Sequence, residues 1–250
     1  MATKREPKSK AIEKPKAKRG VLAYLKERHD PLTGLLLTIP VFLVYHLGIL
    51  AVDLRNGVDL VSMATFELLD RSLLAYVGVT LGYAFAIGVA VFVLRRRGRI
   101  KPAELLPVLG ESVLLAIVMF FTVGWATQQI FDMQAGPAAM NPLEKLVMAA
   151  GAGFHEELIF RVVLFAGGAL ALRKLARLGD AKAAWIAAVV SSLLFSAIHY
   201  IGPLGDDFHI VSFTFRFLAG MYLAAVYRFR GFAVAVYTHS IYDVFVFFLM

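Results

Sequence analysis

The sequence predicts an all-α, polytopic bundle of transmembrane helices. Its 250 residues are 59% hydrophobic, and the mean hydropathy is +0.71, whereas soluble domains are roughly 45–50% apolar. Several apolar runs reach the roughly 20 residues that a helix needs to cross a bilayer. Because the runs follow one another closely, we expect a single bundle of about seven spans, with six to eight compatible with the pattern.

Seven apolar segments are the candidate spans, with ends defined to within a few residues. They are residues 34–52, 73–94, 112–131, 143–172, 183–200, 210–227 and 232–249. The fourth segment is longer than a minimal span and is followed by a basic cluster. The loops after the first and third segments lean acidic or contain proline, so they separate the spans clearly.

The net charge of +8 is concentrated near the N-terminus, since residues 1–30 contain ten Lys or Arg and four acidic residues. This composition favours a disordered cytoplasmic tail that also touches anionic lipid, rather than a nucleic-acid-binding segment. Further basic clusters at 95–101, 173–182 and 228–230 fall on the same side of the predicted topology as the tail. The positive-inside rule therefore predicts a cytoplasmic N-terminus and, with seven spans, an outer C-terminus.

The fourth span carries His155, Glu156, Glu157 and Arg161 near its middle. A charged residue at the centre of a membrane helix costs about 2.5–3.5 kcal/mol on insertion scales and usually marks function. Residues four apart share a helix face, so we expect Glu157 and Arg161 to form an ion pair. Glu156 points about 100° away from Glu157 in an α-helix, so its partners should come from other helices.

The later spans supply His199, Arg216, His239 and Asp243, and the last two share a helix face. We predict that Glu156 meets His199 and His239. A carboxylate beside two imidazoles suits hydrolysis, because the carboxylate can take a proton from water while the imidazoles orient the water or donate to an oxyanion. The same three side chains could instead hold a divalent metal, and the absence of cysteine excludes thiolate chemistry.

The remaining polar residues have less specific interpretations. We expect His155 to line the cavity or support the site, and Arg216 to be either a structural partner or a contact for a substrate carboxylate. His46 and His209 are expected at the membrane interface, and His29 in the tail.

Three short motifs follow one another in the C-terminal part of the chain: Glu156-Glu157-x-x-x-Arg161, Phe195-x-x-x-His199 and His239-x-x-x-Asp243. In this order they resemble the motifs of the CAAX prenyl protease and bacteriocin-processing family (CPBP, also called Abi). The resemblance covers about residues 140–250. It implies a membrane-embedded endopeptidase of the glutamic type, formerly described as a metalloprotease, in which Glu157 and Arg161 support the first motif.

The resemblance also implies catalytic roles. Glu156 would activate water with His199, while His239 and the position of Asp243 would stabilise the oxyanion. The family commonly has Asn at that last position. An ionised carboxylate only accepts hydrogen bonds, whereas Asn can donate one. Asp243 would then orient His239, be protonated, or favour a metal.

The expected function is hydrolysis of a peptide bond in a membrane-associated protein or peptide, with the lipid bilayer as the other partner and no nucleic acid. No cofactor is required on the glutamic interpretation. Zinc is the alternative, held by Glu156, His199 and His239. The alternative function is a non-catalytic membrane protein of the same fold, such as a bacteriocin immunity factor or scaffold. A proton-relaying transporter fits the motifs less well, and we detect no internal repeat.

These interpretations give a three-part division of the chain. Residues 1–30 are the basic tail, residues 31–139 the N-terminal transmembrane helices, and residues 140–250 the catalytic core. We expect an integral protein of a prokaryotic cell (inner) membrane.

Overall fold

The computed structural model of the protein describes part of the chain. The described residues are 24, 29–52, 73–96, 101–124, 140–201 and 205–249. Within these ranges the chain forms helices and no strand, which confirms the all-α class. Most of the basic tail, the acidic loop that follows the first span and the predicted end of the third span at 125–131 lie outside the described residues.

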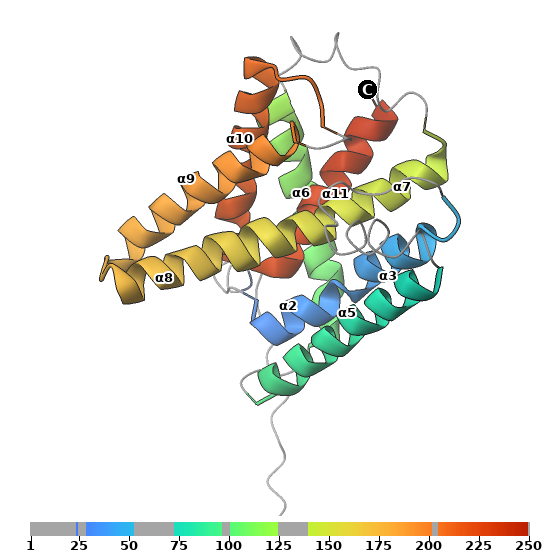
Figure 1. The fold of residues 1–250 in the computed structure, drawn as a ribbon, viewed down its shortest axis with the longest axis horizontal. Coiled ribbons are helices and arrows are strands. Elements are labelled where there is room, and N and C mark those ends of the chain that lie inside the picture. The colour runs from blue at the N-terminus through green and yellow to red at the C-terminus, as the bar shows by residue number, and fades with distance from the viewer. Residues whose placement is uncertain are drawn as a thin grey trace, which may run out of the picture.

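The described helices form seven consecutive rods (Figure 1). They are α2 (Pro31–Leu37) with α3 (Ile39–Gly48); α5 (Leu73–Leu94); η1 (Pro102–Glu104) with α6 (Leu105–Met119) and η2 (Phe120–Gly124); α7 (Pro142–Gly151) with η6 (Ala152–Gly167) and α8 (Gly168–Leu175); α9 (Asp180–Ile198); α10 (Ile210–Arg230); and α11 (Phe232–Leu249). Six rods are long and apolar enough to cross a membrane by length and composition. The remaining rod, residues 142–175, contains the charged motif. The predicted polytopic bundle is therefore confirmed.

Side-chain caps fix where two of the rods begin. The Asp30 carboxylate accepts a hydrogen bond from the backbone N–H of Thr33 at 3.0 Å, with Pro31 in the first turn. At the start of α7, Asn141 and Glu144 form a reciprocal capping box. Caps of this kind satisfy backbone N–H groups that the first turn of a helix leaves without intrahelical partners.

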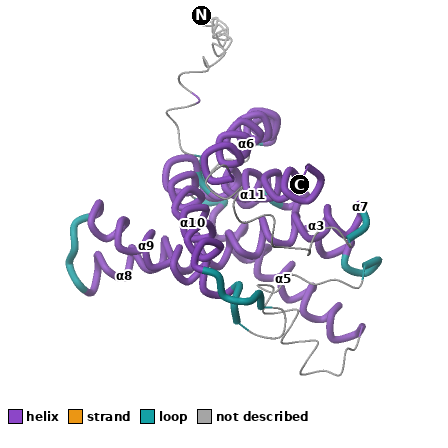
Figure 2. Tube along the Cα trace, turned by 90° about the horizontal axis from the view of Figure 1, so that it is seen from above, coloured by secondary structure: helices purple, strands orange, loops and turns teal. Residues whose placement is uncertain are grey.

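Helix α11 lies inside the bundle (Figures 1 and 2). It packs against α2, α6, α7, η6 and α10, and its residues 233–236 are fully buried. Two polar contacts fasten it to the N-terminal helices, because Tyr237 donates to the carbonyl of Leu37 at 2.8 Å and Ser112 donates to the carbonyl of Val234 at 3.3 Å. The helix that carries the third motif is therefore held by elements from both halves of the chain.

The turn into α11 depends on Gly231. Its φ of 101° lies in the left-handed region, where a side chain would be strained. The N–H of Gly231 still donates to the carbonyl of Tyr227 at 3.0 Å. This geometry ends α10 and reverses the chain within one residue.

Helix α5 lies at the edge of the bundle in both views (Figures 1 and 2). None of residues 77–94 is buried inside the protein, although the segment is the most apolar of the candidate spans. Large side chains such as Leu81, Phe85 and Val89 are exposed. A helix that is apolar around its whole circumference needs an apolar surround, which here is the lipid of the bilayer.

Glycines allow neighbouring rods to approach closely. A Cβ atom at Gly48 would lie 2.3 Å from Val147, and one at Gly151 would lie 2.4 Å from the ring of Tyr45. Both contacts join α3 to the long rod at 142–175. Small residues at such positions are typical of helix packing in membranes, where close van der Waals contact drives association.

A group of polar residues, here called the anchor cluster, fastens the start of the described chain to α6 and α10. It consists of Tyr24, His29, Glu104, Glu111 and Arg230. The Nδ1 atom of His29 lies 2.8 Å from Glu104, Tyr24 donates to Glu111 at 3.0 Å, and Arg230 donates to both carboxylate oxygens of Glu111. The sequence places His29 in the tail, but its side chain is buried against the bundle.

The anchor cluster predicts a pH-dependent stability. Burial alone would lower the pKa of His29, but the carboxylates of Glu111 and Glu104 outweigh this effect, so the net pKa is raised. A raised pKa stabilises the folded state below the ordinary histidine pKa of about 6.5, and the benefit is lost as the pH rises through the raised value. We therefore expect His29→Gln to cost about 1.5–3 kcal/mol at acidic pH and progressively less at higher pH.

Unfolding midpoints of the detergent-solubilised protein, measured across this pH range, provide the test. Replacement of His209, which is exposed just before α10, serves as the control and should leave the profile unchanged. A pH-independent difference between wild type and His29→Gln would contradict the assignment.

Candidate active site

The first motif lies on η6, a π-helical segment inside the long rod. The α-helical geometry expected for this span is wrong for residues 152–167, which form π-helical turns. π-Helical turns are rare and occur frequently at functional sites. The motif residues Glu156, Glu157 and Arg161 are all buried within this segment.

Glu157 connects the first motif to the third. One carboxylate oxygen accepts a hydrogen bond from Nε of Arg161 at 3.0 Å, and the other lies 3.0 Å from Nδ1 of His239. Glu157 and Arg161 are both fully buried. The predicted ion pair is therefore present. His239 also approaches Glu156, as predicted, but its hydrogen bond is with Glu157, which the sequence did not predict.

The second ring nitrogen of His239 faces two further carboxylates. Its Nε2 atom lies 3.8 Å from Glu156 and 3.7 Å from Asp243. Since a carboxylate accepts hydrogen bonds, the contact with Glu157 places a proton on Nδ1. Nε2 is thus directed toward the two carboxylates at distances longer than a hydrogen bond.

His199 is the C-terminal cap residue of α9. Its Nδ1 atom donates to the carbonyl of Phe195 at 2.7 Å, so in the neutral ring Nε2 is the acceptor. The imidazole lies within electrostatic range of Glu156, His239 and Arg216. The structure therefore brings the second motif to the same site as the first and third.

Phe195 is an aromatic contact shared by the three motifs. Its ring centroid lies 5.2 Å from the ring of His199 and 6.0 Å from that of His239, and the guanidinium of Arg161 lies 4.9 Å above it. Phe160 packs edge-on against the same ring at 5.2 Å. Its role was not predicted, although its position four residues before His199 placed it on the same face.

Asp243 lies one turn beyond His239 on α11. Its side chain is 17% exposed, against 7% for Glu156 and 0% for Glu157, so it lies on the more open side of the site. The 3.7 Å separation from His239 fits the alternative in which Asp243 orients that imidazole.

Arg216 has partners outside the motifs. It donates to Asp206 at 2.5 Å and lies 5.2 Å from the ring centroid of Tyr200. The backbone N–H of Asp206 in turn donates to the carbonyl of His199 at 2.8 Å. These contacts favour the structural-partner alternative, in which Arg216 holds the chain that follows His199.

His155 lies in an aromatic cluster beside the site. Its Nδ1 atom lies 3.0 Å from the carbonyl of Gly151, and its ring contacts those of Tyr45, Tyr83 and His46 at centroid distances of 4.7–5.9 Å. His46 is 3% exposed, so its side chain is enclosed by protein, while its predicted place at the membrane interface stays a prediction. Helix α3 presents His46 to His155 of η6. The hydrophobic pattern of a single span does not show which of its faces meets another helix.

The close approach of η6 to α11 depends on Gly153. A Cβ atom at this position would lie 1.9 Å from the hydroxyl of Ser240 and 2.8 Å from the carbonyl of Val236. Ser240 is the neighbour of His239, so this contact sets the separation that the Glu157–His239 hydrogen bond spans.

The ligand set predicted for zinc is not gathered as a metal site. Within the described ranges, no group of three or more His, Asp or Glu side chains is arranged to hold a metal ion. Nδ1 of each histidine faces a protein oxygen, Phe195 for one and Glu157 for the other. These hydrogen bonds leave Nε2 of both rings available, as in metal-ligating histidines, so metal dependence stays a prediction of the sequence.

The comparison with protein families covers the same part of the chain. Residues 139–245 match the family described as type II CAAX prenyl endopeptidase Rce1-like. This match, over less than half of the chain, agrees with the resemblance carried by the three motifs. The apolar helices indicate an integral membrane protein. No curated protein and no solved structure matches the chain.

The contact at Gly153 predicts a strong positional effect. We expect Gly153→Ala to push η6 away from α11 and to cost about 1–3 kcal/mol, the usual penalty for overpacking. Gly88→Ala on α5 is the matched control, because a Cβ atom there meets nothing within 4 Å. Unfolding midpoints in detergent provide the measurement, and equal midpoints for the two variants would contradict the assigned contact.

Proposed function

We propose that the protein is a membrane-embedded endopeptidase that hydrolyses a peptide bond of a membrane-associated protein or peptide, with Glu156 as the general base. The observation that carries this proposal is that the two ring nitrogens of His239 face different carboxylates. Glu157 fixes one side of its ring at 3.0 Å, so the other side faces Glu156 and Asp243. Such a buried, oriented imidazole beside a second carboxylate supports hydrolytic chemistry.

The first half of the reaction uses Glu156 and His199. Glu156 accepts a proton from a water molecule, whose oxygen attacks the scissile carbonyl carbon. Nε2 of His199 accepts the second hydrogen bond from that water and aligns it, because Nδ1 is already engaged with the carbonyl of Phe195. Two acceptors on one water orient a lone pair toward the substrate.

The second half uses His239. With a proton on Nε2, His239 donates to the oxyanion of the tetrahedral intermediate, while Glu157 holds the other nitrogen. Collapse of the intermediate breaks the C–N bond, and the leaving amine takes the proton from Glu156. This returns Glu156 to the carboxylate form. Asp243, at 3.7 Å, keeps His239 directed at the oxyanion.

The proposed base predicts a large effect of Glu156→Gln. Loss of general-base catalysis should lower cleavage by about 10²–10⁴-fold, with the protein still inserted and folded. The matched control is Glu144→Gln on the same rod, because Gln also completes a capping box at that position.

The substrate can be found with the same variant. In cells that carry Glu156→Gln as the only copy, the uncleaved substrate should accumulate in the membrane fraction and be identified by mass spectrometry against the Glu144→Gln strain. Cleavage of that substrate by purified Glu156→Gln at the wild-type rate would overturn the proposal in favour of a non-catalytic membrane protein.

Asp243 gives an independent prediction. If it orients His239, then Asp243→Asn, which preserves shape and restores the residue common in the family, should keep activity within about tenfold. Asp243→Leu should lose about 10²-fold, in the range of one lost oxyanion contact. Equal activities of the two variants would remove Asp243 from the proposed mechanism.

Metal dependence can be decided on the purified protein. We expect full cleavage after dialysis against a strong chelator, since no step above uses a metal. Loss of activity after chelation and recovery with zinc would replace the glutamic mechanism by a metal-assisted one. Glu144→Gln, treated in the same way, controls for effects of the chelator on the protein itself.

A further inference from the structure

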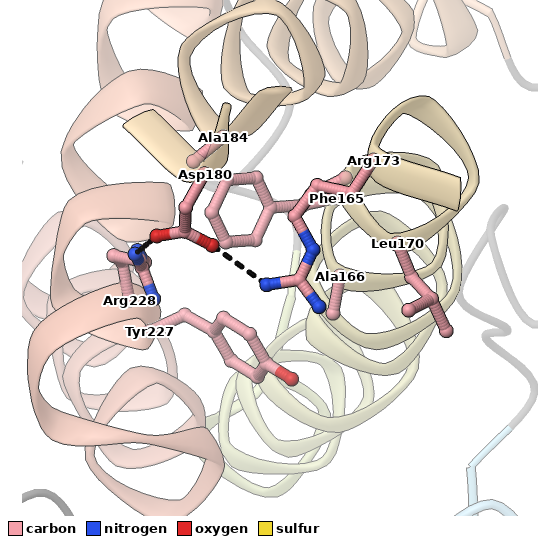
Figure 3. Close-up of a pocket in the computed structure, with 9 residues that line it drawn as sticks. Phe165, Ala166, Leu170, Arg173, Asp180, Ala184, Tyr227 and Arg228 are labelled. Atoms are coloured by element: carbon pink, nitrogen blue, oxygen red, sulfur yellow. Dashed lines mark hydrogen bonds and ion pairs between the residues drawn. The ribbon is translucent and has the colours of Figure 1, made fainter. Parts of the chain in front are cut away.

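A cavity separate from the candidate active site lies where η6, α8, α9 and α10 meet (Figure 3). Its volume is about 270 Å³. Aromatic and aliphatic side chains line most of it, including Phe165, Leu170 and Tyr227. Charged residues gather at one side, and none of the motif residues contributes to the lining.

Two arginines from different helices converge at the charged side of this cavity. Arg173 of α8 donates to Asp180 at 2.7 Å, and Arg228 of α10 donates to the other oxygen of the same carboxylate. Figure 3 shows the Asp180 carboxylate between the two guanidinium groups. The three charges sum to +1, so the single carboxylate leaves the pair of arginines incompletely neutralised.

Both arginines have donors left for a further anion. A guanidinium carries five N–H groups, and each of these two spends only part of its set on Asp180. The side chain of Arg173 is 46% exposed and that of Arg228 is 40% exposed. A phosphate group takes hydrogen bonds from guanidinium in the same geometry as the carboxylate already held there.

The position of the cavity indicates where such an anion comes from. Arg173 and Arg228 belong to the basic clusters that the positive-inside rule assigns to the cytoplasmic face. Basic pockets between transmembrane helices on that side bind the headgroups of anionic lipids. The apolar part of the lining, Phe165, Leu170 and Tyr227, gives an acyl or glycerol segment an apolar surface beside the charges.

We propose that this cavity is a binding site for the phosphate of an anionic phospholipid, held by Arg173 and Arg228. Asp180 accepts from both guanidinium groups and therefore competes with the phosphate for their donors. Phe165 lies on η6, the segment that also carries Glu156. A bound lipid therefore bridges α8, α10 and the helix of the first motif, and it does so whether or not the chain is a protease.

The test uses the full chain purified in detergent and measures its unfolding midpoint with added lipid. Phosphatidylglycerol should raise the midpoint by a few degrees, because a ligand that binds only the folded state stabilises it. Phosphatidylcholine and inorganic phosphate should raise it by less than half as much. The double variant Arg173→Gln/Arg228→Gln should lose the phosphatidylglycerol shift. Arg95→Gln/Arg96→Gln, which alters two exposed arginines just beyond α5, should keep it.

A second pair of variants keeps the test decisive if the double arginine variant does not fold. Asp180→Asn removes the competing carboxylate and should enlarge the shift, whereas loss of a purely structural ion pair would leave the shift unchanged. Ala184→Leu, which fills the lining, should reduce it.

Two results would overturn the proposal. Equal shifts with phosphatidylglycerol and phosphatidylcholine, or equal phosphatidylglycerol shifts in all variants, would show non-specific lipid association. A full-sized shift with inorganic phosphate would assign the site to the free anion instead of a lipid.

Discussion

The contact of Glu157 with both Arg161 and His239 is the interaction on which the site depends. A charge removed from water is tolerated only when it is paired and hydrogen-bonded. Here one carboxylate satisfies a cation on its own helix and an imidazole on another, both at 3.0 Å. Nδ1 of His239 is therefore fixed by Glu157, and Nε2 faces Glu156 and Asp243. The close approach of η6 to α11 at Gly153 brings Glu157 within hydrogen-bonding distance of His239.

Much of this arrangement is readable from the sequence because it is local. The four-residue spacing predicts the Glu157–Arg161 pair, the order of the three motifs predicts the family, and the long apolar runs predict the bundle. His239 lies near Glu156 as predicted, at 3.8 Å, but its hydrogen bond to Glu157 was not predicted, because the prediction used α-helical geometry on one rod and the sequence does not say how α11 faces that rod. The π-helical geometry of residues 152–167 was not predicted, because the apolar pattern of this span is equally compatible with an α-helix.

The burial of two histidines was also not predictable from the sequence. His29 and His46 looked peripheral because one precedes the first span and the other lies near its end. In the structure each is buried by side chains that come from distant segments, Glu104 for the first and His155 for the second. Hydropathy locates a span along the membrane normal. It does not say which face of the span meets protein and which meets lipid.

The burial of α11 has a consequence for what counts as one unit of this protein. The family match ends at residue 245 and begins at residue 139, yet the buried surface of α11 is completed by α2 and α6, and Tyr237 hydrogen-bonds to Leu37. The stretch that carries the recognisable motifs is thus shorter than the stretch that shares their core. The N-terminal helices α2 and α6, in which we recognise no motif, pack against α11, the helix that carries the third motif.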